Sequence, residues 1–321
     1  MTNFWLSIPK PFFALAPMED VTDTVFRQIV AQCARPDVFF TEFVSVEGLL
    51  SRGRKRVEQS LQFTESEHPI VAQIWGLDPK KYYAVAQELV ERGFDGIDIN
   101  MGCPIRKVVK KGACAALIKN PSLAKEIIIA TKEGAGNLPV SVKTRIGYNS
   151  IVIEDWMGFL LKQNLDALTI HGRTAKELSV APVHWDEIGK VVNMRDELKA
   201  QTLIIGNGDV KNREEGLVKV KQNGVDGVMI GRGIFQNLWA FASLRHVRDA
   251  SHMLDLMLKH CELFCDTWRE RKSFLILRKF FKIYISGFEG ASQWRDRFMK
   301  TKSIGEVEDL ANKLKSIFIQ V

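Results

Sequence analysis

Eight short apolar runs, each followed by a turn and then a helical pattern, constrain the fold of this chain more than any other feature. Their apolar residues are continuous rather than alternating, which indicates parallel strands buried on both faces. The runs lie at Phe13–Ala16, Val38–Thr41, Ile70–Ile74, Gly96–Ile99, Val140–Val142, Ala167–Ile170, Leu203–Ile205 and Gly227–Ile230. Eight strand–helix units in succession predict an α/β fold of the TIM-barrel type, a closed (β/α)8 barrel.

Helical patterns fill the intervals between the predicted strands. Gly93 and Gly224 follow two of them, where a left-handed residue commonly ends a helix. A doubly wound open sheet is the competing fold, but it requires a glycine-rich phosphate turn after its first strand. That turn, Ala16-Pro17-Met18-Glu19, has no glycine. We expect helices at Pro79–Arg92, Pro121–Glu133, Glu154–Gln163 and Glu214–Asn223.

The strand pattern stops after about Phe235, and helical spacing of apolar residues replaces it. Gly287 and Gly290 interrupt this region. We expect a TIM barrel with the catalytic site over residues 1–243 and a small helical domain over residues 244–321. The two should pack directly, because no low-complexity linker separates them. The expected helices of the tail lie at Met253–Trp268, Phe274–Ser286 and Ile304–Ile319.

Positive charge is concentrated in the tail. The chain carries a formal net charge of +7, and between Arg245 and Lys302 thirteen Lys and Arg face seven Asp and Glu. A basic segment on a near-neutral body favours a polyanionic partner such as a nucleic acid. A solvated helical surface rich in Lys and Arg explains the same pattern equally well.

Cysteine usage and hydropathy predict a cytoplasmic protein. The five cysteines, at positions 33, 103, 114, 261 and 265, are odd in number and irregularly spaced, as expected for reduced thiols. No apolar run is long enough to cross a membrane, and no secretory leader is recognisable. We expect no contact with a membrane and a monomeric protein.

Polar and glycine residues follow every predicted strand. The active site of a TIM barrel lies at the carboxyl ends of its strands, so these residues should meet at one edge. They are Pro17-Met18, Glu42, Gln73, Asn100–Pro104, Lys143 with Arg145, His171–Arg173, Asn207–Asp209 and Gly231–Gly233.

The turns after the seventh and eighth strands predict a phosphate site. Glycines such as Gly208 and Gly231 let backbone N–H groups approach a phosphate closely, and this is the usual phosphate position in such barrels. Arg232 could add a charge-assisted hydrogen bond. Two ordinary tight turns are the alternative interpretation.

Lys143 lies near the end of an apolar strand, where a buried cation requires an electron-rich partner. An anionic reduced flavin or a Schiff-base carbonyl would supply one, and a side chain that reaches solvent would need none. Gln73 and Asn100 offer paired donors and acceptors for the edge of a heterocycle. His171 is either a further polar contact or a hydrogen-bonded core histidine.

Cys103 stands in a Gly-Cys-Pro turn directly after a strand, as either a nucleophile or a proton donor. The basic run Arg106–Lys111 that follows could contact phosphates or form a solvated loop. Cys261 and Cys265 lie beside His260, but no further ligands stand at matching spacing, so we expect core packing and no metal. Arg52–Arg56 is a second short basic cluster.

The segment Ile97–Pro104, followed by a basic loop and Gly112-Ala113, resembles the signature of the tRNA-dihydrouridine synthases. The resemblance runs in collinear order from about residue 13 to residue 298. Further matching segments are Ala16–Met18, Val21–Asp23, Ser141–Arg145, His171–Thr174, Asn207–Asp209, Asp226–Gly233, Arg278-Lys279, Tyr284, Gly287 and Gly290-Ala291.

This resemblance implies an FMN-dependent barrel with a helical tRNA-binding tail that includes Arg278 and Lys279. Tightly bound FMN, reduced by NADPH or NADH, would deliver a hydride to C6 of a uracil, and Cys103 would protonate C5. Asn100 and Arg145 would lie near that uracil. The residues implied to contact FMN are Pro17, Met18, Gln73, Lys143 and His171 at the ring system, and Asn207, Gly208, Asp209, Gly231 and Arg232 at the phosphate end.

The chain departs from the family pattern at several positions. Asp20 and Cys114 stand where the family has glycine or another small residue. Phe280 and Leu238 replace a common His and a common Pro, and the expected Gln and Tyr are absent from Ala175–Val180. A flavin barrel that reduces a small molecule, a Schiff-base lyase that uses Lys143 and a non-catalytic RNA-binding barrel are the alternative functions.

Overall fold

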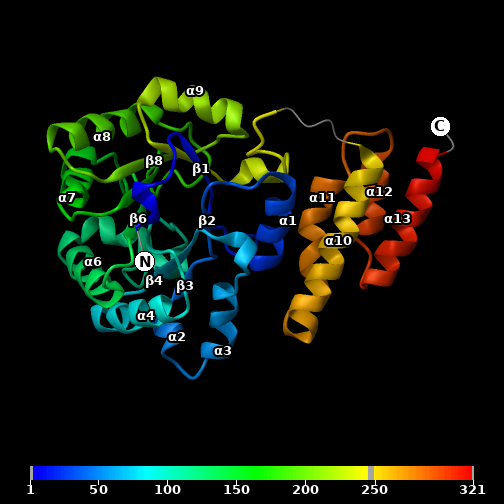
Figure 1. Cartoon of the computed structure of the whole chain (residues 1–321), viewed down its shortest axis with the longest axis horizontal. Coiled ribbons are helices and arrows are strands. Elements are labelled where there is room, and N and C mark those ends of the chain that lie inside the picture. Colours follow the sequence, from blue (N-terminus) through cyan, green and yellow to red (C-terminus); the bar gives the residue numbers. More distant parts are fainter. Residues whose placement is uncertain (1–2, 245–248, 320–321) are drawn as a thin grey trace.

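A computed structural model describes residues 3–244 and 249–319 and shows a closed barrel with a helical tail beside it (Figure 1). The strands are all parallel, and their order is β1-β9-β8-β7-β6-β5-β4-β2, with β3 pairing with β4. A bridge from Ala14 to Val38 closes the barrel between β1 and β2. The predicted TIM barrel is therefore confirmed. The strands are β1 (Phe12–Leu15), β2 (Phe39–Phe40), β3 (Val44–Ser45), β4 (Ile70–Trp75), β5 (Gly96–Met101), β6 (Val140–Arg145), β7 (Ala167–His171), β8 (Leu203–Asn207) and β9 (Gly227–Ile230).

The pairing register places the polar strand ends in two neighbouring rows. Asn100 of β5 is level with Lys143 of β6, and Arg145 of β6 is level with His171 of β7. His171 is in turn level with Asn207 of β8. The apolar residues before them are buried on both sides of the sheet, which explains the continuous runs in the sequence.

Helices surround the barrel (Figure 1). Asp78 and Asn120 cap α4 and α6 through backbone N–H groups, and a proline occupies the first turn of each helix. Gly93 and Gly224 have φ values of 80° and 70°, as the sequence predicts for helix ends. The helices are α1 (Thr24–Ala34), α2 (Val46–Leu49), α3 (Arg54–Val57), α4 (Pro79–Glu91), α5 (Arg106–Val109), α6 (Pro121–Ala135), α7 (Gly158–Leu161), α8 (Trp185–Glu197) and α9 (Arg213–Asn223).

Two expected helices take other forms. The stretch predicted at Glu154–Gln163 is a π-helical turn, Ile153–Met157, that continues into the short α7. The stretch predicted at Phe274–Ser286 is a 3₁₀ segment, Phe274–Phe280, followed by α11. In both places the apolar spacing is right, but tertiary packing decides the hydrogen-bond pattern.

The tail contains four α-helices among its described residues: α10 (Ala250–Trp268), α11 (Phe281–Tyr284), α12 (Ala291–Phe298) and α13 (Ile304–Ile319). The sequence did not predict α12, because only Ala291 and Phe298 of that helix are buried and the apolar pattern is correspondingly weak. The domain boundary expected at residues 243 and 244 stays a prediction. It adjoins residues 245–248, which lie outside the described part of the chain and include Arg245, the first residue of the basic stretch. No described helix has the length and apolarity needed to cross a membrane.

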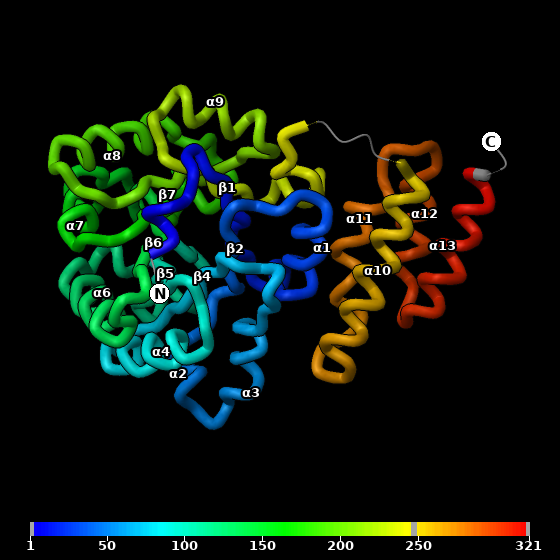
Figure 2. Tube along the Cα trace, viewed as in Figure 1, coloured from blue at the N-terminus to red at the C-terminus, as the bar shows by residue number. Residues whose placement is uncertain are grey.

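The tail packs directly on the barrel, with α10 against α1 (Figure 2). Phe26 of α1 stacks on Phe280 with 4.9 Å between ring centroids, inside a core cluster that runs from the barrel into the tail. Asp23 adds polar contacts between the barrel and the tail. Its carboxylate caps α1 at the N–H of Phe26 (3.0 Å) and accepts hydrogen bonds from Trp268 Nε1 (2.9 Å) and Lys272 Nζ (3.0 Å).

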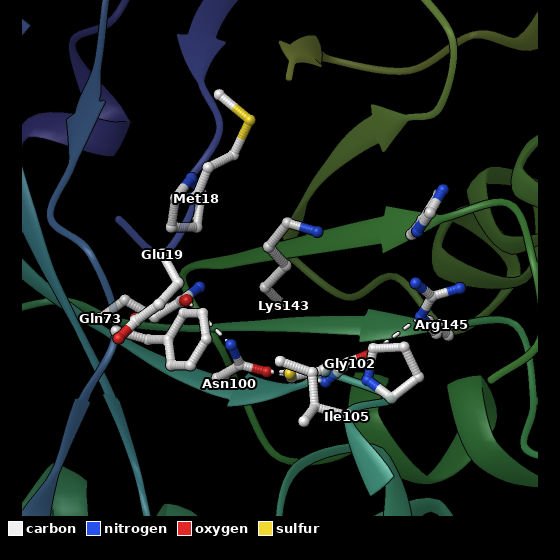
Figure 3. A pocket seen from close by; sticks show the side chains of 13 residues that line it. Met18, Glu19, Gln73, Asn100, Gly102, Ile105, Lys143 and Arg145 are labelled. Atoms are coloured by element: carbon white, nitrogen blue, oxygen red, sulfur yellow. Dashed lines mark hydrogen bonds between the residues drawn. The ribbon is translucent and has the colours of Figure 1, made fainter. Parts of the chain in front are cut away.

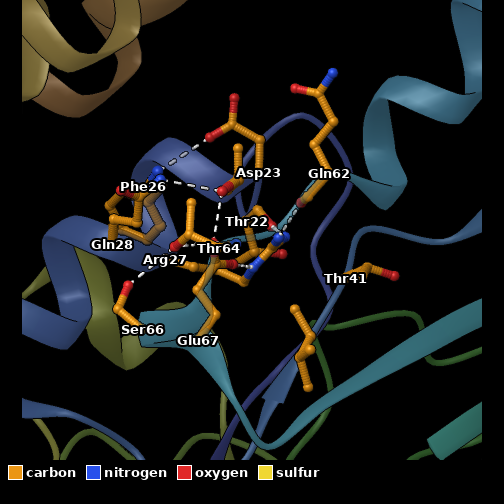
Figure 4. A network of polar contacts seen from close by, with 12 residues as sticks. Thr22, Asp23, Phe26, Arg27, Gln28, Thr41, Gln62, Thr64, Ser66 and Glu67 are labelled. Atoms are coloured by element: carbon orange, nitrogen blue, oxygen red, sulfur yellow. Dashed lines mark hydrogen bonds and ion pairs between the residues drawn. The ribbon is translucent and has the colours of Figure 1, made fainter. Parts of the chain in front are cut away.

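A buried ion pair holds the segment between β1 and α1 (Figure 4). Arg27 pairs with Glu67, and both side chains are fully buried. Arg27 also donates to the backbone oxygens of Thr22 and Gln62, at 2.6 Å each. The hydroxyl of Thr22 accepts from the N–H of Met18 at 2.9 Å. The network therefore fixes the turn that carries Met18 to the barrel wall.

We expect Asp23→Ala to destabilise the chain by more than the loss of a helix cap alone. The substitution removes the cap and leaves the buried Trp268 N–H and the Lys272 ammonium unpaired, so the free energy of unfolding should fall by about 2–4 kcal/mol. Asn212→Ala, which removes only the cap of α9, is the matched control and should cost about 1 kcal/mol. Chemical denaturation measures both, and equal losses would contradict the inter-domain role of Asp23.

Candidate active site

Two adjoining cavities at the carboxyl edge of the barrel form one cleft. The larger, about 600 Å³, we call the wide end, and the smaller, about 260 Å³, the narrow end. Pro17, Met18, Lys143 and His171 line both. The wide end is otherwise lined by Ala16, Ser179, Asn207–Lys211, Gly231–Gly233 and Gln236, and the narrow end by Glu19, Phe43, Gln73, Asn100, Gly102–Ile105 and Arg145.

Buried amides shape the narrow end (Figure 3). Asp98 accepts hydrogen bonds from Gln73 Nε2 and Ser141 Oγ, both at 2.7 Å. Gln73 Oε1 then accepts from Asn100 Nδ2 (2.9 Å). Asn100 Oδ1 accepts from the N–H groups of Gly102 (3.0 Å) and Cys103 (2.9 Å). Burial raises the pKa of Asp98 to about 6. This chain of bonds fixes both amide orientations and sets the turn that presents Cys103.

Arg145 braces the same turn from the neighbouring strand. Its Nε donates to the carbonyl of Gly102 at 2.7 Å. Its Nη1 donates to the carbonyls of Thr174 (3.0 Å) and Leu178 (2.6 Å). The side chain is only 5% exposed, and burial lowers its pKa to about 10. Arg145 therefore holds the Cys103 turn and the 174–178 loop together while its guanidinium lines the cavity.

The thiol of Cys103 lies at the narrow end, half-buried beside Cys114. A hydrogen bond from the Cys114 thiol lowers the pKa of Cys103 to about 7, and burial acts in the opposite direction. The backbone N–H of Ile105 and the positive charges of Arg145 and Lys143 also lower this pKa. At neutral pH Cys103 therefore exists as both thiol and thiolate.

Lys143 stands at the centre of the cleft, with Met18 on one side and Asn100 on the other (Figure 3). Its Nζ donates to Asn207 Oδ1 at 3.1 Å, and Asn207 Nδ2 donates to the carbonyl of Met229 at 2.8 Å. No carboxylate in the described ranges forms an ion pair with it. Burial, reinforced by the charge of Arg145, lowers the pKa of Lys143 to about 8.

His171 is a neutral imidazole in this cleft. Burial lowers its pKa to about 2, and the nearby charges of Lys143 and Arg145 act in the same direction. Its Nε2 lies 3.3 Å from Nη1 of Arg173, so this nitrogen is the acceptor and Nδ1 carries the proton. The ring is therefore a hydrogen-bonding group and not a cation.

Arginine–aspartate pairs hold the turns of the wide end. Asp209, at a left-handed φ of 51°, pairs with Arg173 and with Arg232 (2.6 Å). The hydrogen bond from Arg173 lowers the pKa of Asp209. A Cβ at Gly208, where φ is 141°, would lie 2.6 Å from Val183, so only glycine fits there. The predicted phosphate-site residues therefore all line one cavity.

Two carboxylates near the cleft were given no predicted role: Glu42 was expected only as a residue at a strand end, and Glu19 was not singled out. Glu19 lines the narrow end, and its pKa is raised to about 7 by partial burial and by the charges of Glu42 and Asp20. Glu42 is buried, and this burial raises its pKa to about 7, with a further contribution from Asp23. The position of Glu42 directly after the second apolar run was the available signal. Its burial beside Glu19 depends on tertiary packing.

The two predicted tail residues do not line the cleft. Arg278 donates to the carbonyls of Thr301 (2.7 Å) and Lys300 (3.3 Å), so it ties the end of α12 to the segment before α11. Lys279 donates to the carbonyl of Asp20, next to Glu19 at the cleft. Burial lowers the pKa of Lys279. Both side chains therefore support the packing of the tail.

The unusual residues Asp20 and Cys114 both adopt the left-handed backbone conformation, with φ of 57° and 53°. That region favours glycine, which is the residue expected at such positions from the resemblance described above. The backbone at both positions therefore has a conformation that glycine adopts readily, although Asp and Cys occupy it here.

Comparisons with known proteins agree with this geometry. The family model described as dihydrouridine synthase (Dus) matches residues 14–319. A Staphylococcus aureus (strain Mu50 / ATCC 700699) protein named "Probable tRNA-dihydrouridine synthase" is 47% identical over 98% of this chain and 96% of its own. A Bacillus subtilis (strain 168) protein named "Probable tRNA-dihydrouridine synthase 2" is 45% identical over 99% and 98%.

Among solved structures, the fold is similar to that of a 2-naphthoyl-CoA reductase in complex with 2-naphthoyl-CoA. The TM-score is 0.54 at 9% identity, over 71% of this chain and 48% of that one, which is a likeness of fold alone. The family match and the two relatives carry more weight, because they cover nearly all of the sequence. The chain belongs to the dihydrouridine synthase family, a family of flavin-dependent oxidoreductases.

Proposed function

We propose that this protein reduces specific uridines of tRNA to 5,6-dihydrouridine, with FMN as cofactor and NADPH or NADH as reductant. The observation that carries the proposal is the layout of one cleft. Glycine turns with Arg232 lie at its wide end, the cation of Lys143 lies at its centre, and the thiol of Cys103 lies at its narrow end. The names of the two relatives support tRNA dihydrouridine synthesis as the reaction.

The residues of the cleft fit FMN. Gly208, Gly231 and Arg232 offer close backbone approach and positive charge for a phosphate. Lys143 is a buried cation whose hydrogen-bond partner, Asn207, is neutral, so an electron-rich ring would stabilise it. Pro17, Met18 and the neutral His171 provide the remaining wall, and Gln73 lies beneath it.

FMN held in this cleft would supply hydride chemistry towards C6 of the uracil, with the nicotinamide dinucleotide as its reductant. The protein would supply a proton to C5, and the turn that carries Cys103 for this role is held by Asn100 and Arg145. A general acid works best when its pKa lies near the operating pH, and the pKa of Cys103 is about 7. Asn100 and Arg145 form the wall against which the uracil would lie.

The target uracil must leave its stack to reach this thiol, because the cleft lies inside the mouth of the barrel. Enzymes that modify a base commonly flip it into such a pocket. The tail is held beside the turn after β1 through Asp23 and Lys279, and its excess of Lys and Arg would supply the positive charge that binding to tRNA requires. We expect the protein to act as a monomer in the cytoplasm.

The proposal is tested first by Cys103→Ala. We expect reduction of uracil to fall by about 10²- to 10⁴-fold while flavin binding is retained, because only the proton donor is lost. Single-turnover reoxidation of the reduced flavin by tRNA measures this rate. Cys265→Ser, which changes a cysteine of α10 outside the cleft, is the control and should react like the wild type. A wild-type rate for Cys103→Ala would rule out this thiol as the acid.

Lys143→Met tests whether Lys143 contacts the flavin ring. Without the central cation, we expect weaker FMN binding and a lower reduction potential, because the negative charge of reduced FMN loses its partner. Fluorescence titration and redox titration measure the two quantities, with Lys125→Met on the exposed side of α6 as control. Wild-type affinity together with a wild-type potential would contradict the assignment of Lys143.

Substitution of Arg278 and Lys279 tests whether the tail binds tRNA. If they contact tRNA phosphates, replacing both by Ala should lower the salt dependence of binding by about 0.7–0.9 log units per lost contact. Arg278 also holds two carbonyls, so a melting curve must first show that the variant is folded at the assay temperature. Oxidation of NADPH by oxygen should be unchanged. A wild-type affinity and a wild-type salt slope would show that these two residues do not contact phosphates. The contacts would then have to be sought in the loops at residues 52–56 and 106–111.

A further inference from the structure

Cys114 is a buried cysteine close to Cys103, and the proposed reaction gives it no role. It is fully buried in a small apolar cluster with Val108 and Ala113, and Cys103 packs against this cluster. The N–H of Ala115 donates to the carbonyl of Cys103 at 3.3 Å, which holds the two segments together. Cys114 also adopts a left-handed φ of 53°, a conformation that costs a side chain energy and is retained mostly where function or packing requires it.

We propose that Cys114 is a positioning residue for the reduction, whose S–H donates a hydrogen bond to the sulfur of Cys103 and stabilises the thiolate that forms there. The proposal rests on the proposed role of Cys103 as the general acid. It assigns a role to the second cysteine, where the family resemblance leads one to expect a small residue.

The surroundings of the two sulfurs determine which of them donates. Cys114 lies among apolar side chains, with the carboxylate of Glu47 nearby, and burial raises its pKa well above the ordinary value. Cys103 faces the cations of Arg145 and Lys143, which favour its ionised form. Cys114 therefore stays protonated and Cys103 is the sulfur that ionises.

The remaining neighbours of Cys103 have smaller or opposing effects. The backbone N–H of Ile105 donates to its sulfur and also favours the thiolate. Glu19 lies on the facing side of the cleft, and its charge and that of a Cys103 thiolate disfavour each other. Tyr82, a buried neighbour of Cys114, is un-ionised because burial raises its pKa. The Cys114 thiol has the largest single effect on the pKa of Cys103.

The proton transfer shows why this hydrogen bond matters. As the S–H bond of Cys103 breaks and a C–H bond forms at C5 of the uracil, the electron pair of the S–H bond stays on sulfur. Negative charge therefore develops on the sulfur of the residue that packs against the Cys114 cluster, next to the proposed donor. A donor that is fixed before the reaction lowers the barrier more than water, which must reorient. A proton from solvent then restores the Cys103 thiol.

The consequence is a change in pH dependence that a purely structural role would not cause. Reduction needs the protonated thiol, so the rate falls as the pH rises through the pKa of Cys103. Without the Cys114 donor this pKa moves up towards its ordinary value, so activity should persist to higher pH. The limiting rate at low pH should fall, because the developing thiolate has lost its donor.

The rate at which iodoacetamide alkylates Cys103 depends on the fraction of thiolate. Peptide mass spectrometry of the flavin-loaded protein at a series of pH values therefore measures the ionisation of Cys103. For the wild type we expect a midpoint near pH 7. In Cys114→Ala and Cys114→Gly the midpoint should rise by about one pH unit or more. Cys114→Ser should stay near the wild type, because a hydroxyl also donates. Cys265→Ser is the matched control and should not move the midpoint.

The outcomes separate this inference from the proposed function. An unchanged midpoint in both Cys114→Ala and Cys114→Gly would overturn the role of Cys114. Glycine suits the left-handed backbone at this position, so that variant keeps the test valid if the alanine variant does not fold. If the midpoint shifts but Cys103→Ala still reduces tRNA at the wild-type rate, the hydrogen bond is real and the assignment of Cys103 as the acid is wrong.

Discussion

The register of the parallel strands is the constraint on which the site depends. Because β5 to β8 are paired in a fixed register, Asn100 and Lys143 lie in one row, and Arg145, His171 and Asn207 lie in the next row towards the carboxyl edge of the barrel. A slip of one residue would turn these side chains towards the opposite face of the sheet and bring apolar ones into the cleft. The buried apolar residues that precede them hold the register, so the core and the chemistry are fixed by the same hydrogen bonds.

The electrostatics of the cleft follow from burying several cations close together. Burial and then the charge of Arg145 lower the pKa of Lys143, and burial together with both charges keeps His171 neutral. The same two charges, with the Cys114 thiol and the N–H of Ile105, bring the pKa of Cys103 close to neutrality. A cation-rich cleft of this kind favours both an anionic cofactor and a proton donor that must end its step as an anion.

The helical tail is joined to the barrel near the cleft. Asp23 links the start of α1 to Trp268 and Lys272 of the tail, and Arg27 links the same segment to the turn that carries Met18. The position of the tail and the wall of the cleft are therefore set by one short stretch of chain. The tail is thereby held at a fixed place relative to the cleft, as the proposed binding of tRNA requires.

The sequence by itself determined the barrel, because continuous apolar runs and helix caps are local patterns. It also predicted the four residues that line both cavities, which are Pro17, Met18, Lys143 and His171. It also identified Cys103 and the glycine turns, since residue type and position after a strand carry that information. Only the tertiary structure showed that Arg278, which the resemblance assigns to tRNA binding, donates from Nε and Nη2 to the carbonyls of Lys300 and Thr301. It also decided the burial of Glu42 and the contact of Cys114 with Cys103. Such contacts join segments whose separation along the chain carries no pattern, and the charge and burial of a group depend on every neighbour that the fold brings to it.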